Sequence, residues 1–315
     1  MAFARAYLRS TRPYTFFITG TAGLCGILAV GGGSDLLRTS ISLVLLFSAY
    51  GINQVVNDLL GSREDRINKV SRPLVTGELD RSKAWQMTGL LFVAGAVVTF
   101  FLNPYALIVY VAGYAFNVIY EELKGVPVLG NLWFGAMISL APIYGAMTTG
   151  ALTPGDVINE RALVYVVLLV AVLQSNMCYF TYFKDVEGDR KAGKRTLVVF
   201  LGPAISRYVN LAVFPLPFLL LGALIISGAM EQGAGPVPIF LLSMSMLLNF
   251  IMVLVLIRDP ASGRLPLELN FQGAVLFQNG LVALFSPLPG AILGTVSFIS
   301  ILVIFRIMYR KGFYG

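Results

Sequence analysis

The stretch that decides the fold is residues 162–183, ALVYVVLLVAVLQSNMCYFTYF, which is apolar almost throughout. Its length falls within the about 17–25 residues that a helix needs to cross a lipid bilayer. It runs directly into KDVEGD (residues 184–189), a charged segment in a chain that is only 12% charged. We therefore expect a membrane helix that delivers carboxylates to the membrane surface.

Similar apolar runs occur along the whole chain. Its 315 residues are 57% hydrophobic and their mean hydropathy is +0.79, as in polytopic membrane proteins. We predict an all-α bundle of nine transmembrane helices that forms a single membrane domain over residues 1–315. The expected spans are 14–31, 37–60, 83–102, 104–121, 128–149, 162–183, 205–228, 237–257 and 282–307.

The positions of Lys and Arg predict how the bundle is oriented. If the N-terminus is cytoplasmic, most of the 23 basic residues lie in cytoplasmic segments, as the positive-inside rule requires. Arg306, Arg310 and Lys311 then fall on the opposite side, against the rule. We expect an integral protein of a bacterial or archaeal cell membrane with its active site at the cytoplasmic face.

Acidic–basic segments follow the second and the sixth expected spans, four spans apart. This spacing suggests two related four-helix halves plus one additional helix, with each half contributing one acidic segment to a shared cavity. The first motif covers about residues 53–77 and the second about residues 184–196.

Composition also excludes several classes of site. The chain has no His and only two isolated cysteines, Cys25 and Cys178, so neither a zinc site nor a disulfide framework is supported. The net charge of +7 is concentrated at one membrane face, and we expect no nucleic-acid partner.

The first motif places polar side chains where an apolar run ends. Asn53, Asn57, Gly61 and Asp65 are spaced four residues apart, so on a continuous helix they would share one face. Amides and carboxylates at the end of a membrane span are costly and usually functional. A solvated helix end is the structural alternative.

The second motif repeats this chemistry. Asp185 and Asp189 are four residues apart, so one Mg²⁺ could lie between them. Carboxylates without His favour a hard cation, and the interspersed Lys and Arg suit a Mg²⁺-bridged diphosphate. Ordinary positive-inside charge is the alternative explanation for each basic residue. The two motifs together predict an enzyme that ionises an isoprenyl diphosphate.

The two motifs resemble those of the UbiA superfamily of intramembrane prenyltransferases. The family's first pattern falls on Asn57, Asp58, Gly61, Asp65, Asn68, Arg72, Pro73 and Gly77. Its second falls on Lys184, Asp185, Glu187, Gly188, Asp189, Arg190, Gly193 and Thr196. A third segment falls on Tyr120, Leu123, Lys124, Pro127, Gly130 and Asn131. The resemblance spans nearly the whole chain and implies a helical bundle with a central cavity that binds Mg²⁺ and a polyprenyl diphosphate.

These motifs define the candidate site residues. The expected catalytic residues are Asp185, Asp189, Asp65 and Asn57. The expected Mg²⁺ ligands are Asn57, Asp58, Glu64, Asp65, Asp185 and Asp189. The residues expected to hold the diphosphate are Arg66, Lys69, Arg72, Lys124, Lys184, Arg190 and Lys194. The residues expected to line the cavity are Asn53, Asn117, Tyr120, Asn176 and Tyr179, with packing as the alternative for the aromatic ones.

Position 61 departs from the family pattern, which has an Asp there. Gly61 has no side chain to hold a metal, so Asn57, Glu64 and Asp65 must hold that ion or the site binds fewer ions.

Three functions fit these observations. The first is transfer of a prenyl group to an aromatic or lipid-like acceptor. The second is a membrane terpene cyclase of the same superfamily, which uses no acceptor. The third is a transporter, which the position of the charged groups at helix ends rather than at the bilayer midplane disfavours.

Overall fold

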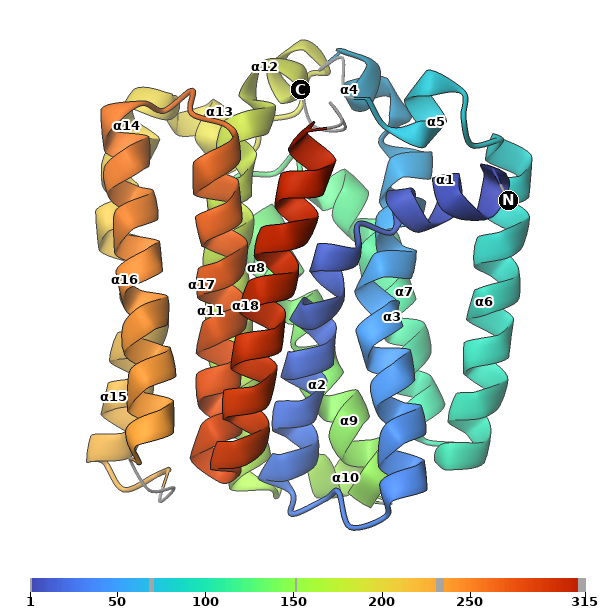
Figure 1. The fold of residues 1–315 in the computed structure, drawn as a ribbon, viewed down its shortest axis with the longest axis vertical. Coiled ribbons are helices and arrows are strands. Elements are labelled where there is room, and N and C mark those ends of the chain that lie inside the picture. The colour runs from blue at the N-terminus through green and yellow to red at the C-terminus, as the bar shows by residue number, and fades with distance from the viewer. Residues whose placement is uncertain (1, 68–70, 151, 231–234, 311–315) are drawn as a thin grey trace.

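The computed structural model describes residues 2–67, 71–150, 152–230 and 235–310. Within these ranges the chain forms helices and connecting loops, with no strand among them. The long helices run roughly side by side and form an elongated bundle (Figure 1). The all-α prediction is confirmed.

Short helices lie mainly at the two ends of the bundle. They are α1 (Ala2–Ser10), η1 (Pro13–Thr15), α4 (Ser62–Ile67), α5 (Pro73–Thr76), α10 (Pro154–Val157), η2 (Tyr182–Asp185), α12 (Val186–Lys191) and α13 (Leu197–Leu201).

The longer helices make up the body of the bundle. They are α2 (Phe16–Ala29), α3 (Leu36–Leu60), α6 (Arg81–Leu102), α7 (Ala106–Leu123), α8 (Leu129–Ile138), α9 (Leu140–Gly150), α11 (Arg161–Thr181), α14 (Pro203–Val213), α15 (Leu216–Ile226), α16 (Pro236–Arg258), α17 (Arg264–Phe285) and α18 (Pro287–Arg310).

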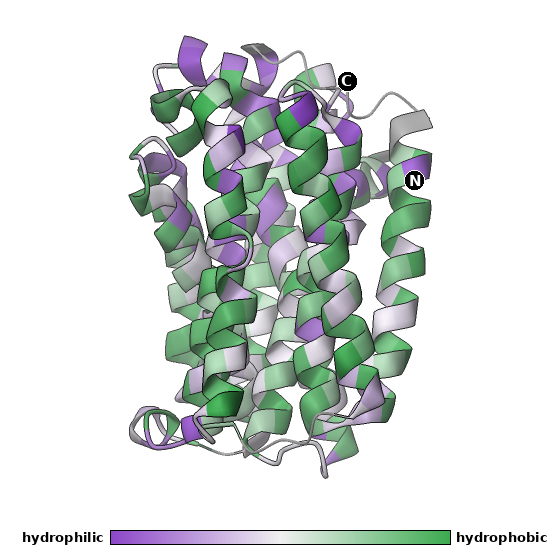
Figure 2. Ribbon diagram, turned by 90° about the vertical axis from the view of Figure 1, so that its left-hand side faces the viewer, coloured by the Kyte–Doolittle hydropathy of each residue, from purple (hydrophilic) through white to green (hydrophobic). Residues whose placement is uncertain are grey.

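The body of the bundle is built to lie in lipid. In the described residues, eight helical segments are long and apolar enough to cross a membrane, and η1 with α2 forms a shorter apolar one over Pro13–Ala29. Large apolar side chains such as Phe101, Leu219 and Phe240 are exposed on its outside, as expected of a lipid-facing surface. Hydrophilic residues gather at the end that carries α4, α5 and α12, whereas the length of the helices is mostly hydrophobic (Figure 2).

The C-terminal region corrects one prediction. We expected a loop over residues 258–281 and a final span over 282–307, but the structure has helix α17 over most of that loop and a break at Ser286 before α18. The additional helix returns the chain to the end where it began, and both termini lie there (Figure 1). The basic residues at the C-terminal end of α18 are therefore on the same side as the two motifs, as the positive-inside rule prefers.

Helix α17 was missed because it is polar yet central. Every residue from Pro266 to Leu284 is buried, including Glu268, Asn270, Gln272 and Gln278. These side chains lower the hydropathy of the run below that of a lipid-facing span. A helix enclosed by its neighbours can carry them, because it does not contact lipid.

The order of the elements agrees with the expected repeat as far as the motifs are concerned. The first motif follows α3 and the second follows α11, and both reach the same end of the bundle. The relation between two four-helix halves stays a prediction. In that arrangement two helices, α17 and α18, would lie outside the halves, whereas the prediction has one additional helix.

Candidate active site

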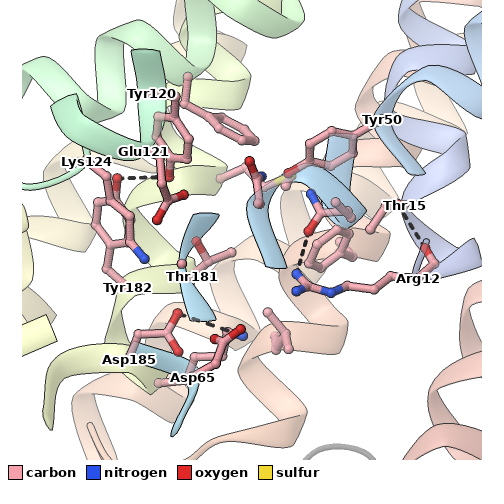
Figure 3. Close-up of a pocket in the computed structure, with 18 of the residues that line it drawn as sticks. Arg12, Thr15, Tyr50, Asp65, Tyr120, Glu121, Lys124, Thr181, Tyr182 and Asp185 are labelled. Carbon is pink, nitrogen blue, oxygen red and sulfur yellow. Dashed lines mark hydrogen bonds and ion pairs between the residues drawn. The ribbon is translucent and has the colours of Figure 1, made fainter. Parts of the chain in front are cut away.

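A polar cavity opens at the end of the bundle where the two motifs meet. It encloses about 890 Å³ of empty space, including its open mouth, and it draws residues from η1, α3, α4, α7, α8, α11, η2, α12 and α17. Asp65 of the first motif and Asp185 of the second lie at one end of it (Figure 3). Segments far apart in the sequence therefore build one site.

The first motif enters the cavity because α3 stops at Leu60. Gly61 caps α3, and α4 begins at the next residue, so the chain bends where the polar stripe leaves the bundle. Asn57, Gly61 and Asp65 all line the cavity, as their spacing predicted. Burial raises the pKa of Asp65 above its ordinary value, and the neighbouring Arg72 offsets this only in part.

Asp58 faces away from the cavity and forms a buried cluster of ion pairs. It pairs with Arg12 and also accepts a hydrogen bond from Nη1 of Arg72 at 3.0 Å. The same Nη1 bonds Asp65. The Asp58 side chain is only 1% exposed and pairs with both arginines, and its role as a Mg²⁺ ligand stays a prediction.

The second motif reaches the cavity where an α-helix changes into a 3₁₀ helix. Helix α11 tightens into the 3₁₀ turn η2, which ends at Asp185, and α12 then carries Asp189. Both carboxylates line the cavity. Nζ of Lys184 lies 3.8 Å from Asp185 Oδ2, and Nζ of Lys124 lies 3.5 Å from Asp189 Oδ1.

Among these carboxylates, Asp189 has the fewest hydrogen-bond partners for its burial. It is fully buried, and neither of its oxygens makes a hydrogen bond to another described residue. A buried carboxylate without hydrogen bonds is costly. The burial of Lys124 would lower its pKa, but Asp189 and Glu121 hold that pKa above its ordinary value. The cavity thus combines carboxylates for a cation with fixed positive charges for an anion.

An apolar chamber lies beyond the polar cavity. Tyr50 and Phe134 line the polar side and form an edge-on ring pair with centroids 5.9 Å apart. One turn further from the motifs on the same two helices, Leu46, Met137 and Ile138 line a second cavity of about 530 Å³. Its other lining residues are largely apolar, so the two compartments differ sharply in chemistry.

Several predicted residues do not reach the polar cavity. Arg66 and Arg190 are exposed, and Lys194 lies beside the cavity and bonds Glu121. Lys69 and the side chain of Glu64 lie outside the described residues. Of the expected cavity residues, only Tyr120 lines this cavity.

The predicted amides and Tyr179 have other contacts. Asn53 lines the apolar chamber, and its carbonyl accepts a hydrogen bond from Asn117 at 3.4 Å. Asn176 donates to the carbonyl of Val213, and Tyr179 donates to the carbonyl of Ser206. These side chains satisfy backbone carbonyls between helices, which a polar residue in a span commonly does.

Sequence analysis missed other residues that line the cavity. They are Arg12, Tyr14, Thr15, Tyr50, Gln54, Glu121, Phe134, Met177, Thr181, Leu267 and Phe271. Tyr182 lines the cavity as well, as an aromatic residue of a span could. The sequence indicates Arg12 only as part of a basic N-terminal segment, and the residues of α17 are too polar to be predicted as a span. Glu121 alone carried a usable signal, since it precedes Lys124 by three residues and a helix places such residues on one face.

The donor set fits a hard cation only in part. Asp65, Asp185, Asp189 and Asn57 offer oxygen atoms, and Asn57 Oδ1 and both oxygens of Asp189 make no hydrogen bond to the described residues. Yet among the described side chains no three acidic, His or Cys residues are gathered closely enough to enclose a metal by themselves. A cation here would need oxygen atoms from a ligand as well, as Mg²⁺ on a phosphate does.

The fold and the cavities define a class of membrane-embedded helical protein with a cavity of carboxylates and basic side chains at one end and an apolar chamber next to it. Residues 16–272 match the UbiA prenyltransferase family, and the chain belongs to that family. Together with the eight apolar helical segments, this makes it an integral membrane protein and a prenyltransferase by family.

Relatives and solved structures agree with this assignment. A digeranylgeranylglyceryl phosphate synthase of Pyrococcus furiosus is 27% identical over 259 residues, which cover 81% of this chain and 88% of the relative. The enzyme of the same name from Thermococcus kodakarensis is 28% identical over 208 residues, covering 65% and 72%. A UbiA homologue from Archaeoglobus fulgidus, solved with DMAPP and Mg²⁺, shares the fold at a TM-score of 0.64 and 17% identity, over 96% of this chain and 99% of that one.

Proposed function

We propose that this protein transfers the prenyl group of an isoprenyl diphosphate to a lipid-like acceptor, with Mg²⁺ as cofactor and the polar cavity as its active site. One observation carries the proposal: two motifs that lie far apart in the sequence contribute carboxylates and cations to one cavity that adjoins an apolar chamber. A diphosphate with a long hydrocarbon chain has the same division into polar and apolar parts.

The residues of the cavity divide into two roles. Arg72, Lys124 and Lys184 are placed to bind diphosphate oxygens, because each lines the cavity and its charge lies beside a carboxylate of one of the motifs. Asn57 and the carboxylates of Asp65, Asp185 and Asp189 would hold Mg²⁺. The cation supplies charge that stabilises the diphosphate as a leaving group.

The chemistry requires a carbon–oxygen bond to break at the boundary of the two compartments. The electron pair of that bond leaves on the diphosphate, and the acceptor oxygen or carbon forms the new bond to the allylic carbon and gives up a proton. The rings of Tyr50, Tyr120 and Phe134 line this region, and aromatic faces stabilise a positive charge nearby. The chain of the donor would extend past Tyr50 and Phe134 into the apolar chamber.

The relatives favour a glycerol-based acceptor over an aromatic one. Their name describes a glyceryl phosphate that carries two geranylgeranyl groups. We therefore infer that the donor is a geranylgeranyl-type diphosphate and the acceptor a prenylated glyceryl phosphate. The basic end of the bundle, with both termini, would face the cytoplasm by the positive-inside rule.

Incubation of the purified protein in detergent with Mg²⁺ and geranylgeranyl diphosphate tests the proposal. Product that forms only with geranylgeranylglyceryl phosphate, and not with 4-hydroxybenzoate, is the expected outcome, and EDTA should abolish it.

A terpene cyclase is the second candidate, because Gly61 departs from the family pattern and the cavity is rich in aromatic rings. Formation of a cyclic hydrocarbon or alcohol without any acceptor would favour it over transfer. No consumption of the diphosphate under any of these conditions would contradict both.

A further inference from the structure

The carboxylate of Glu121, which comes from another helix, lies where a side chain at position 61 would point. A Cβ atom built on Gly61 would lie 3.0 Å from Oε1 and 3.6 Å from Cδ of Glu121. Gly61 caps α3, whereas Glu121 lies in the last turn of α7, more than fifty residues further along the chain. An aspartate at position 61 would direct its carboxylate to the place that Glu121 already fills.

Glu121 is held in this position by a lysine of the second motif. Nζ of Lys194 donates to Oε1 of Glu121 at 2.9 Å and to the carbonyl oxygen of Glu121 at 3.3 Å. The two side chains are only 12% and 17% exposed, Glu121 being the less exposed. The carboxylate of Glu121 points into the cavity in Figure 3. It is therefore an ordered group of the site rather than a surface charge.

A second observation is that the cavity holds buried oxygen atoms that make no hydrogen bond to a described residue, although Lys124 Nζ lies 3.5 Å from one of them, Asp189 Oδ1. Asp189 lines the cavity, is completely buried, and has two oxygens without hydrogen bonds to any described residue. Asn57, whose backbone oxygen lies 3.1 Å from the same Cβ position on Gly61, also has a side-chain oxygen without such a bond. Oxygen atoms from α3, α7 and α12 thus face one space.

We propose that Glu121 is the cation-binding carboxylate of the first motif, supplied by α7 in place of a side chain at position 61. The inference rests on the proposed function, because it assigns Glu121 to the Mg²⁺ that would accompany the diphosphate. It explains how the site can keep the negative charge that an Asp at position 61 would supply, although Gly61 offers no ligand. It also makes the two positions mutually exclusive, since a side chain at position 61 and the Glu121 carboxylate would compete for the same space.

An alternative is that Glu121 only anchors Lys194. The two roles predict different effects on ligand binding when Glu121 is replaced. Loss of an anchor should weaken binding of the anion, whereas loss of a metal ligand should weaken binding of the cation when the anion site is already saturated.

The test measures Mn²⁺ affinity of the full-length protein in detergent by electron paramagnetic resonance, at saturating inorganic pyrophosphate. Glu121→Gln should weaken Mn²⁺ binding at least about 10-fold, because even indirect contacts change metal affinity by 10–100-fold. Glu122→Gln is the matched control, since Glu122 is exposed and does not line the cavity, and it should bind like the wild type. Lys194→Met should lower pyrophosphate affinity and leave Mn²⁺ affinity at saturation within a few-fold.

Exchange of the carboxylate between helices sharpens the test. Gly61→Asp alone should weaken Mn²⁺ binding, whereas Gly61→Asp combined with Glu121→Ala should recover most of the affinity that Glu121→Ala loses. Unchanged Mn²⁺ affinity in Glu121→Gln, or no recovery in the double variant, would overturn the inference while leaving the proposed function standing. Absence of Mn²⁺ binding by the wild type itself would overturn both.

Discussion

The two acidic motifs hold their carboxylates in different ways. In the first motif, guanidinium groups bind Asp58 and Asp65 directly, and Asp58 is enclosed between Arg12 and Arg72. In the second motif, lysines stand 3.5 Å and 3.8 Å from Asp189 and Asp185. Arginine forms strong, directional bonds to a carboxylate, whereas a distant lysine provides only a charge. The carboxylates of the first motif therefore serve in part to hold arginines in place, whereas those of the second motif are more available to a ligand.

Removing a carboxylate from the second motif should give the largest effect on activity. Asp189→Asn and Asp185→Asn should each lower turnover of geranylgeranyl diphosphate by roughly 10²–10³-fold or more, the loss seen when one group that stabilises developing charge is removed. Turnover with radiolabelled donor measures this. Turnover like that of the wild type in either variant would remove the second motif from the site.

Asp58→Asn should instead act on stability. It breaks a buried cluster of ion pairs and leaves two guanidinium groups facing a neutral side chain, which typically costs about 3–5 kcal/mol. Thermal unfolding in detergent should therefore begin at a clearly lower temperature, while Mn²⁺ affinity of the folded protein is kept. Glu78→Gln is the control, because the Glu78 side chain is 48% exposed in its pair with Arg9 and such pairs contribute about 1 kcal/mol or less. Loss of Mn²⁺ binding with unchanged stability would make Asp58 a ligand after all.

The raised pKa of Asp65 predicts a moderate effect of acidic pH. As the pH falls, Asp65 takes up a proton at a higher pH than an ordinary aspartate, and the protonated form is a poor metal ligand. The Mg²⁺ concentration needed for half-maximal activity should rise several-fold on acidification, and more Mg²⁺ should restore the rate. A Mg²⁺ requirement that does not change with pH would contradict a direct role for Asp65.

The smallest effects are expected at the exposed basic residues of the two motifs. Arg66→Ala and Arg190→Ala should change turnover by less than about two-fold, since both side chains are exposed and neither lines the cavity. A larger loss in either, with the stability unchanged, would show that these residues close over the diphosphate when it binds.

Sequence analysis predicted those parts of the molecule that depend on local pattern. Apolar runs found the lipid-facing helices, and the spacing of Asn57, Gly61 and Asp65 predicted their shared cavity. Hydropathy failed at α17, because a helix enclosed by protein can carry Glu268 and Gln278 without contacting lipid. The ion pair of Asp58 with Arg12 could not be predicted either, since the two residues lie 46 positions apart in the chain. The contact of Glu121 with Gly61 could not be predicted for the same reason, because only the folded chain brings these two residues together.

The most direct test of the central claim is whether the two motifs form one Mg²⁺-dependent diphosphate site. Thermal unfolding of the wild type should be measured with the unreactive donor analogue geranylgeranyl S-thiolodiphosphate and Mg²⁺, separately and together. A ligand that binds only the folded state raises the unfolding temperature. We predict a clear rise only when both are present, and its loss in both Asp65→Asn and Asp189→Asn. An undiminished rise in either variant would contradict a single site built from both motifs.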